Sequence, residues 1–116
     1  MKMTQQAIFN KVARGLLKQR RKSKGTAGVR FGYCLIDKQG RRCSLGMLLP
    51  SRWTCGGPGQ NEHATLNRIF GEDHWYRNNF ATDLLDVHNQ NPPRRWPRLL
   101  RALAEKYGLN DKAANP

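Results

Sequence analysis

Residues 5–19 carry their apolar side chains at the spacing of one helix face. The apolar positions recur at i, i+1, i+4, i+5, i+8 and i+9, as Ile8, Phe9, Val12, Ala13, Leu16 and Leu17. Thr4 stands directly before this run, and a threonine hydroxyl there can accept a hydrogen bond from a first-turn N–H. The pattern therefore predicts an amphipathic helix over residues 5–19, which must bury its apolar face against the rest of the chain.

The later segments predict one β-hairpin and three further helices. Residues 29–36 are rich in β-formers, and residues 41–49 resemble a return strand that Pro50 ends. Helices are expected over residues 61–70, 75–88 and 94–107, with Gly108 as the last cap. We therefore expect an α+β fold with an N-terminal amphipathic helix, one antiparallel β-hairpin and three C-terminal helices.

The chain has 116 residues, which is the usual size of one domain. We expect residues 1–109 to form a single compact basic α+β domain and residues 110–116 to be a frayed tail.

The turn between the two predicted strands sets their register. Asp37 and Gly40 suit the first and fourth positions of a type I turn that is followed by a G1 bulge. Opposed residue numbers then sum to 78, which pairs Leu35 with Cys43. Neighbouring residues of a strand point to opposite faces, so Cys34 and Cys43 would neither bridge nor share a metal.

A different loop length leaves a small zinc-binding module open as an alternative. A loop of two or four residues would place Cys34 opposite Cys43, and His63, His74 or His88 could then complete a zinc site. The eight residues between the cysteines exceed the two to four that are usual between zinc ligands. We therefore expect no cofactor and no metal, and keep Cys34, Cys43 and His88 as the ligands of the zinc alternative.

Positive charge is concentrated in the first half of the chain. The sequence carries 21 lysines and arginines against 8 acids, for a net charge of +13. Residues 1–60 hold 13 of these cations and one acid, whereas residues 61–116 hold 8 cations and 7 acids. Such a concentrated excess predicts a binding surface for a polyanion or for a strongly acidic protein.

The candidate contacts come from three groups of cations. One group lies on the polar face of the first helix and in the basic run after it, the second lies at the turn, and the third lies on the last helix. These candidates for nucleic-acid or acidic-partner binding are Lys11, Arg14, Lys18, Arg20, Arg21, Lys22, Lys24, Arg41, Arg42, Arg94, Arg98 and Arg101. Trp53, in a glycine-rich loop, could stack on a base or cover the edge of the core.

Other classes of protein are disfavoured by what the sequence lacks. No segment approaches the roughly 20 apolar residues that a membrane span needs, and no signal peptide is visible. Three cysteines without a secretory context indicate a reducing compartment. No nucleophile with a base partner and no phosphate-cradling glycine motif is evident, so we do not expect an enzyme.

Three stretches follow one another along the chain. They are IFNKVARGLLKQ at residues 8–19, a Cys-x8-Cys segment that runs into GMLLP at residues 46–50, and LLDVHNQNPPRRWPRLLRALAEKYGL at residues 84–109. In this order they resemble a family of small accessory proteins of tailed bacteriophages and prophages. The matching residues are Phe9, Val12, Ala13, Leu16, Leu17, Cys34, Gly40, Cys43, Gly46, Pro50, His88, Trp96, Leu103 and Tyr107.

The resemblance covers most of the chain and departs from it at SRWTCGGPGQ, residues 51–60. It implies a phage origin and an accessory role in the host cytoplasm, and it implies no particular activity. We expect a basic accessory protein that binds DNA or RNA, mainly through phosphates. The alternative is an inhibitor that docks on an acidic surface of a host protein, such as a nucleic-acid enzyme or a CRISPR complex, in host takeover or anti-defence.

Overall fold

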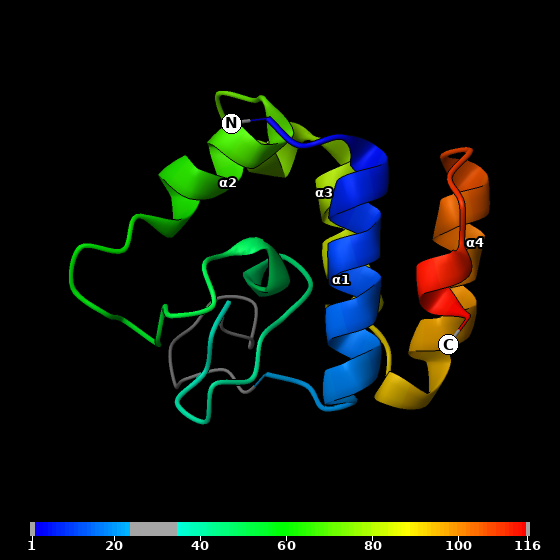
Figure 1. Ribbon diagram of the computed structural model, residues 1–116, viewed down its shortest axis with the longest axis horizontal. Helices are drawn as coiled ribbons and strands as arrows, with labels where there is room; N and C mark the ends of the chain where they lie inside the picture. The colour runs from blue at the N-terminus through cyan, green and yellow to red at the C-terminus, as the bar shows by residue number, and fades with distance from the viewer. Residues whose placement is uncertain (1, 24–34, 116) are drawn as a thin grey trace.

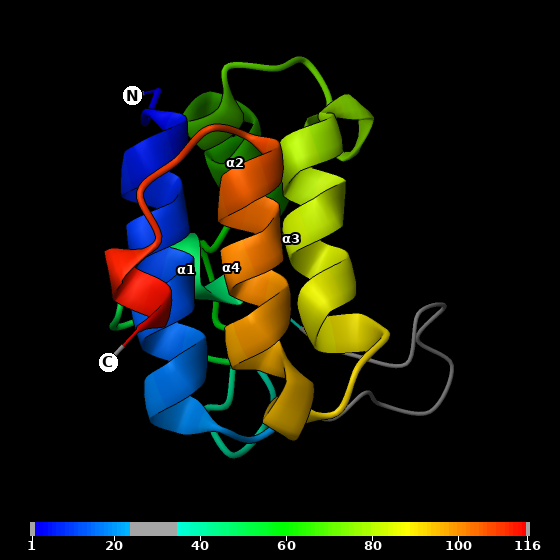
Figure 2. The same cartoon turned by 90° about the vertical axis from the view of Figure 1, so that its right-hand side faces the viewer.

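The computed structural model describes residues 2–23 and 35–115, and within them the secondary structure is helical. Its α-helices are α1 (Gln5–Gln19), α2 (Glu62–Phe70), α3 (Asn79–Asn89) and α4 (Trp96–Lys106). Its short 3₁₀ helices are η1 (Gly46–Leu48), η2 (Trp75–Arg77), η3 (Pro93–Arg95) and η4 (Lys112–Ala114). α1, α4 and α3 run side by side in that order (Figure 2), and α2 lies near the end at which α1 begins (Figure 1). None of the described helices is long and apolar enough to cross a membrane.

One apolar core joins these helices. The apolar face of α1, from Ile8 to Leu17, is buried as the sequence predicted. Trp96 at the start of α4 and Phe80 on α3 bring the largest side chains from the second half of the chain. Burial of each large side chain stabilises the fold by about 1.5–3 kcal/mol. Ala7 N–H donates to Thr4 Oγ1 at 3.1 Å, so both the predicted first helix and its cap are confirmed.

α3 and α4 begin later than the sequence predicted. Asn78 Oδ1 accepts the Ala81 N–H at 3.0 Å and so caps α3, which separates this helix from η2. α4 begins at Trp96, because the residues before it form η3. Gly108 follows α4 with a φ of 66°, as a terminal glycine should. α2 matches its predicted range.

The predicted β-hairpin, and with it the α+β fold class, is wrong. Residues 29–34, the greater part of its first strand, lie outside the described residues. Residues 41–49 form no strand, and the described chain contains one isolated antiparallel bridge, between Ile36 and Arg42. The described part of the protein is therefore a helical fold without a sheet.

The return segment folds as η1 because its apolar spacing is helical. Leu45, Leu48 and Leu49 are all buried, and their i, i+3, i+4 spacing places them on one side of a helical turn that packs on α1. Gly46 lets the backbone come close, since a Cβ at this position would collide with the Leu35 carbonyl oxygen. The segment therefore packs through a close backbone contact and does not continue as a β-strand with a ladder of backbone hydrogen bonds.

The predicted turn is confirmed. Gly40 N–H donates to Asp37 O at 3.0 Å, and Gly40 has a φ of 79°. Asp37 N–H donates to Arg41 O at 2.8 Å, and Cys43 N–H donates to Leu35 O at 3.2 Å. The opposed residue numbers therefore sum to 78, as turn chemistry predicted.

Residues 110–115, which were expected to fray, pack against α1. η4 contacts α1, and Ala114 is fully buried. Asn110 N–H donates to Gln6 Oε1 at 2.8 Å, and Gln6 Nε2 donates back to Asn110 O at 3.0 Å. The C-terminal segment is thus held by paired hydrogen bonds and by a buried methyl group.

Two glycine substitutions should differ sharply in their effect on stability. Gly46→Ala should lower the free energy of unfolding by about 2 kcal/mol or more, because the new methyl group meets rigid backbone at Leu35. Gly15→Ala is the matched control: its methyl group would meet the flexible Met47 side chain, and alanine favours a helix by about 1 kcal/mol over glycine. Urea unfolding measures both values, and equal losses would contradict the close contact at Gly46.

Candidate nucleic-acid interface

The outer face of α1 carries three cations in a row. Lys11, Arg14 and Lys18 are exposed and lie opposite the buried face of the helix. None of the three forms an ion pair with a described acid. At 1.5 Å per residue the row is about 10 Å long. Spaced cations without acidic neighbours suit the backbone of a polyanion.

Arg20 follows α1 in a left-handed backbone conformation. Its φ is 51°, and among the described residues it is the one non-glycine residue with a positive φ. The ends of α2 and α4 use Gly71 and Gly108 for the same purpose. A side chain in this conformation costs roughly 1 kcal/mol relative to glycine. The Arg20 side chain is exposed, so packing does not explain the arginine, whereas a binding role would.

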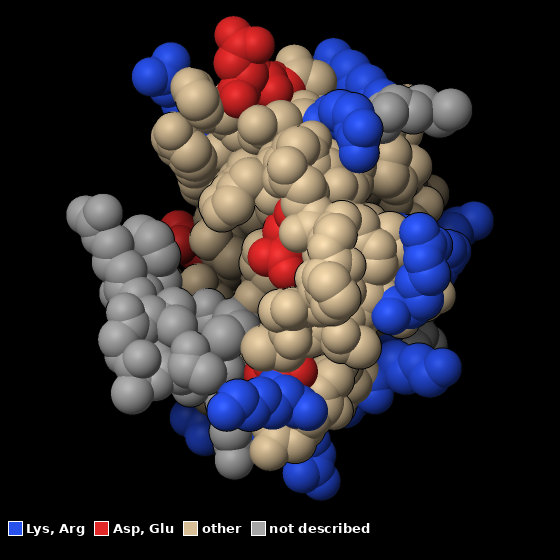
Figure 3. All heavy atoms as spheres, turned by 90° about the vertical axis from the view of Figure 1, so that its left-hand side faces the viewer, with Lys and Arg blue, Asp and Glu red and all other residues tan. Residues whose placement is uncertain are grey.

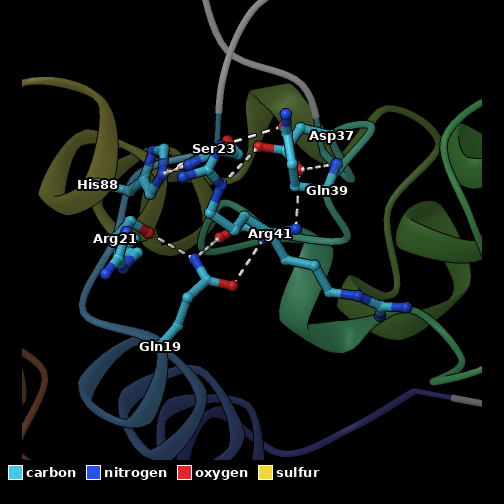
Figure 4. Close-up of polar contacts among 8 residues, drawn as sticks. Gln19, Arg21, Ser23, Asp37, Gln39, Arg41 and His88 are labelled. Carbon is cyan, nitrogen blue, oxygen red and sulfur yellow. Dashed lines mark hydrogen bonds and ion pairs between the residues drawn. The ribbon is translucent and has the colours of Figure 1, made fainter.

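Gln19 fixes the direction of the chain directly after α1. Its Nε2 donates to Arg21 O at 2.6 Å and to Arg42 O at 2.8 Å, and its Oε1 accepts the Arg42 N–H at 2.8 Å. One side-chain amide thus joins the end of α1 to the turn that contains Asp37 (Figure 4). The exposed Arg21 side chain is therefore carried by a fixed backbone.

Two further contacts tie this segment to the end of α3. Ser23 N–H donates to His88 Nε2 at 3.0 Å, and both residues are fully buried. Lys22 Nζ donates to Asn89 O at 3.3 Å. Burial lowers the pKa of the His88 imidazole, the Asn89 contact raises it, and the Lys22 charge lowers it again, with a net decrease. The ring is therefore neutral at pH 7 and can accept the Ser23 N–H.

The start of α4 also lies beside the end of α3, next to His88. The rings of His88 and Trp96 stack with their centroids 5.4 Å apart. Arg94 and Arg95, which precede Trp96, are both exposed. α4 has no acid in its first turn and no side-chain cap, so these cations stand beside the positive end of the helix dipole. A bound anion would relieve that repulsion.

The basic surface is defined here as the outer row of α1, the segment after α1 and the two arginines of η3. Its members are Lys11, Arg14, Lys18, Arg20, Arg21, Lys22, Arg94 and Arg95. The end of α1 and η3 lie together at the lower end of the molecule in Figure 2. On the face in Figure 3, lysine and arginine side chains lie mainly along one edge, at the top and at the lower end, and acidic side chains lie at the top and near the centre. Segments far apart in the sequence thus contribute to one charged region.

Arg41 and Arg42, two of the predicted contacts, have structural partners. Arg41 Nε forms an ion pair with Asp37 Oδ2 at 3.1 Å. The Arg42 guanidinium donates to five carbonyl oxygens, those of Gly46 (2.9 Å), Leu49 (2.8 Å), Pro50 (3.0 Å), Ser51 (3.3 Å) and Trp53 (3.1 Å). Burial lowers the pKa of Arg42, but a guanidinium stays charged in proteins. We leave both arginines out of the basic surface.

Arg98 and Arg101 lie farther along α4, away from η3. They line an open groove of about 720 Å³ between α4 and the C-terminal segment. Lys112, Glu105 and Asp111 line the same groove, so two acids stand there against three cations. Lys24, the remaining predicted cation, lies outside the described residues.

The other sequence candidates are spread over the molecule. Trp53 is partly buried and packs against the core. This position agrees with the prediction that it covers the edge of the core. Cys43 is 2% exposed, and Cys34 lies outside the described residues. His88 is held between Ser23 and Asn89. Within the described ranges no three histidine, cysteine, aspartate or glutamate side chains gather as a metal site would require.

Sequence reasoning missed Arg95 and the connecting role of His88. The stripe through Arg94 assumed a helix from that residue, whereas residues 93–95 form η3 and Pro97 occupies the first turn of α4. His88, which the sequence offered as a ligand of the zinc alternative, packs on Trp96. Its hydrogen bond to Ser23 spans 65 residues of sequence, and no local pattern reports such a contact.

Comparison of the chain with protein-family models, curated proteins and solved structures gave no match. The phage-family resemblance therefore stays a prediction from the sequence, and the function rests on the geometry of the described residues.

Two arginine substitutions test the division between structural and exposed cations. Arg42→Gln should lower the free energy of unfolding by about 2–4 kcal/mol, because the guanidinium hydrogen bonds to five carbonyl groups are lost. Arg14→Gln removes the same charge from the open face of α1 and should stay within about 0.5 kcal/mol of the wild type. Urea unfolding at pH 7 compares them, and similar losses would show that Arg14 is structural as well.

Proposed function

We propose that the protein binds nucleic acid, mainly through phosphate contacts of the basic surface. The observation that supports this best is the fixed, exposed position of cations at the end of α1 and beside η3. Cations on a fixed backbone lose less conformational freedom when they bind. Lysine and arginine contacts to phosphates carry no sequence information, so we expect little base specificity. We further propose an accessory role in a phage-infected cell, on the strength of the sequence resemblance alone.

The strain at Arg20 supports the same proposal. A glycine would fit its backbone better, and the side chain is exposed. An arginine that is kept at a conformational cost is more easily explained by a bound anion than by folding. The unfavourable place of Arg94 and Arg95 at the start of α4 leads to the same conclusion.

The direct test is fluorescence anisotropy of labelled single-stranded DNA, duplex DNA and RNA over a salt series. On duplex DNA, a log–log slope of about −4 or steeper would correspond to roughly four to five or more neutralised phosphates at about 0.9 per contact. Absence of binding at low salt would overturn the proposal. A pulldown from host lysate would then test the acidic-protein alternative.

A double charge reversal should remove binding and leave folding intact. Arg14→Glu with Lys18→Glu removes four units of charge, so the net charge falls from +13 to +9. Arg68→Glu with Arg77→Glu makes the same change at exposed positions on α2 and η2. We expect at least a tenfold loss of affinity for the first variant and a much smaller loss for the second. Equal losses would mean that net charge alone governs binding.

Arg20→Gly should change stability and binding in opposite directions. Relief of the left-handed strain should raise the free energy of unfolding by about 0.5–1 kcal/mol. Loss of the exposed guanidinium should weaken binding to duplex DNA by several-fold. Urea unfolding and anisotropy on the same preparation measure both effects. Unchanged affinity would remove Arg20 from the basic surface.

A further inference from the structure

We propose that His88 is the positioning residue of the basic surface, and that its protonation releases the segment after α1 and weakens nucleic-acid binding. The part of this proposal that concerns binding rests on the proposed function. His88 lies where the segment after α1, the end of α3 and the start of α4 meet. The hydrogen bond of His88 with Ser23 and its stacking on Trp96 fix the position of the Arg20–Lys22 segment relative to Arg94 and Arg95.

The hydrogen bonds of His88 define its protonation state. A backbone N–H can only donate, so His88 Nε2 accepts from Ser23 at 3.0 Å. The neutral ring then carries its proton on Nδ1, which lies 2.7 Å from Asn89 Oδ1 and donates to it. The partners of the two ring nitrogens, a donor at Nε2 and an acceptor at Nδ1, therefore suit a neutral ring with one proton and not a charged ring with two.

A second proton on the ring would oppose the Ser23 N–H. Ser23 Oγ, 3.4 Å from Nε2, could accept that proton, but the backbone N–H would still lose its acceptor. Among the described residues, the charged side chains on the adjoining elements include Arg21 and Lys22 after α1, Asp83 and Asp86 on α3, and Arg94 and Arg95 before α4. Lys22 disfavours a charged ring, and Arg95 is also a cation. Asp86 lies two residues before His88, so it points to another side of α3.

Release of the segment and protonation of the ring are therefore coupled. In the docked arrangement, burial and Lys22 hold the pKa of His88 below its ordinary value of 6.5. In the released arrangement the ring is hydrated, and its pKa returns toward that value. The released state therefore binds the extra proton more readily, and its population grows as the pH falls below about 6.5, by at most about tenfold per pH unit.

The expected pH effect is opposite in sign to simple electrostatics. Protonation of His88 would add positive charge, and added positive charge by itself strengthens binding to phosphates. Wild-type affinity should instead fall by several-fold between about pH 7 and 5.5. His88→Gln offers the Ser23 N–H an amide oxygen that does not titrate. Relative to its own affinity at pH 7, this variant should show no loss on acidification.

The experiment is anisotropy of labelled duplex DNA at fixed salt across this pH range. The wild type is compared with His88→Gln and with Ser23→Ala, a control that keeps the backbone donor and should lose affinity as the wild type does. A wild-type affinity that rises on acidification, in parallel with His88→Gln, would overturn the proposal.

A second measurement uses the free wild-type protein and needs no variant to fold. NMR of the Ser23 amide and of the His88 ring nitrogens should show the hydrogen bond at pH 7 and its loss on acidification, with faster amide exchange than pH alone explains. A Ser23 amide that stays bonded to His88 across the range would overturn the release. If the protein binds no DNA at any pH, the proposed function fails, and the Ser23 data still decide whether His88 releases the segment.

Discussion

The chain between the turn and α2 depends on one guanidinium group. Arg42 gathers five carbonyl oxygens from residues 46–53, a stretch in which no described strand offers N–H partners. The oxygens of Gly46 and Pro50 also accept a backbone N–H, from Leu49 and Trp53, and the guanidinium donates to the oxygens of Leu49, Ser51 and Trp53 as well. The Gln19 amide in turn holds the backbone of Arg42. The end of α1, the turn and the loop before α2 therefore form one connected unit.

Cations in this protein serve two physically distinct purposes. A guanidinium surrounded by carbonyl groups, as at Arg42, or paired with a carboxylate, as at Arg41, stabilises the fold. A cation such as Arg14 or Lys18 on an open helix face leaves folding nearly unaffected and contributes to the external field. The net charge of +13 counts both kinds alike. Only the three-dimensional arrangement separates them, since Arg41 and Arg42 are neighbours of Gln39 and Gly40 in a sequence that looks like an exposed tip.

The helices were predictable because the information about them is local. Apolar period, caps and terminal glycines placed α1 and α2 closely, and turn chemistry gave the register around Asp37. The hairpin prediction was wrong at residues 41–49. They were assigned to a return strand, whereas the burial of Leu45, Leu48 and Leu49 follows helical spacing.

The candidate site was predictable only in part. The row on α1 follows from helical spacing, so Lys11, Arg14 and Lys18 were found directly. The contribution of η3 depends on a buried histidine that joins residues 65 positions apart, and the docking of the C-terminal segment depends on Gln6 and Asn110. Contacts of this kind arise from tertiary packing, which local patterns do not encode.

The paired hydrogen bonds between Gln6 and Asn110 also determine when α1 can be covered during synthesis of the chain. They join residues 104 positions apart, so α1 leaves the ribosome long before the segment that covers it. At roughly 5–20 residues per second, that delay is about 5–20 s. During this time the apolar face of α1 has no complete partner, so α1 is made before α2, α3 and α4 and yet is among the last to be enclosed.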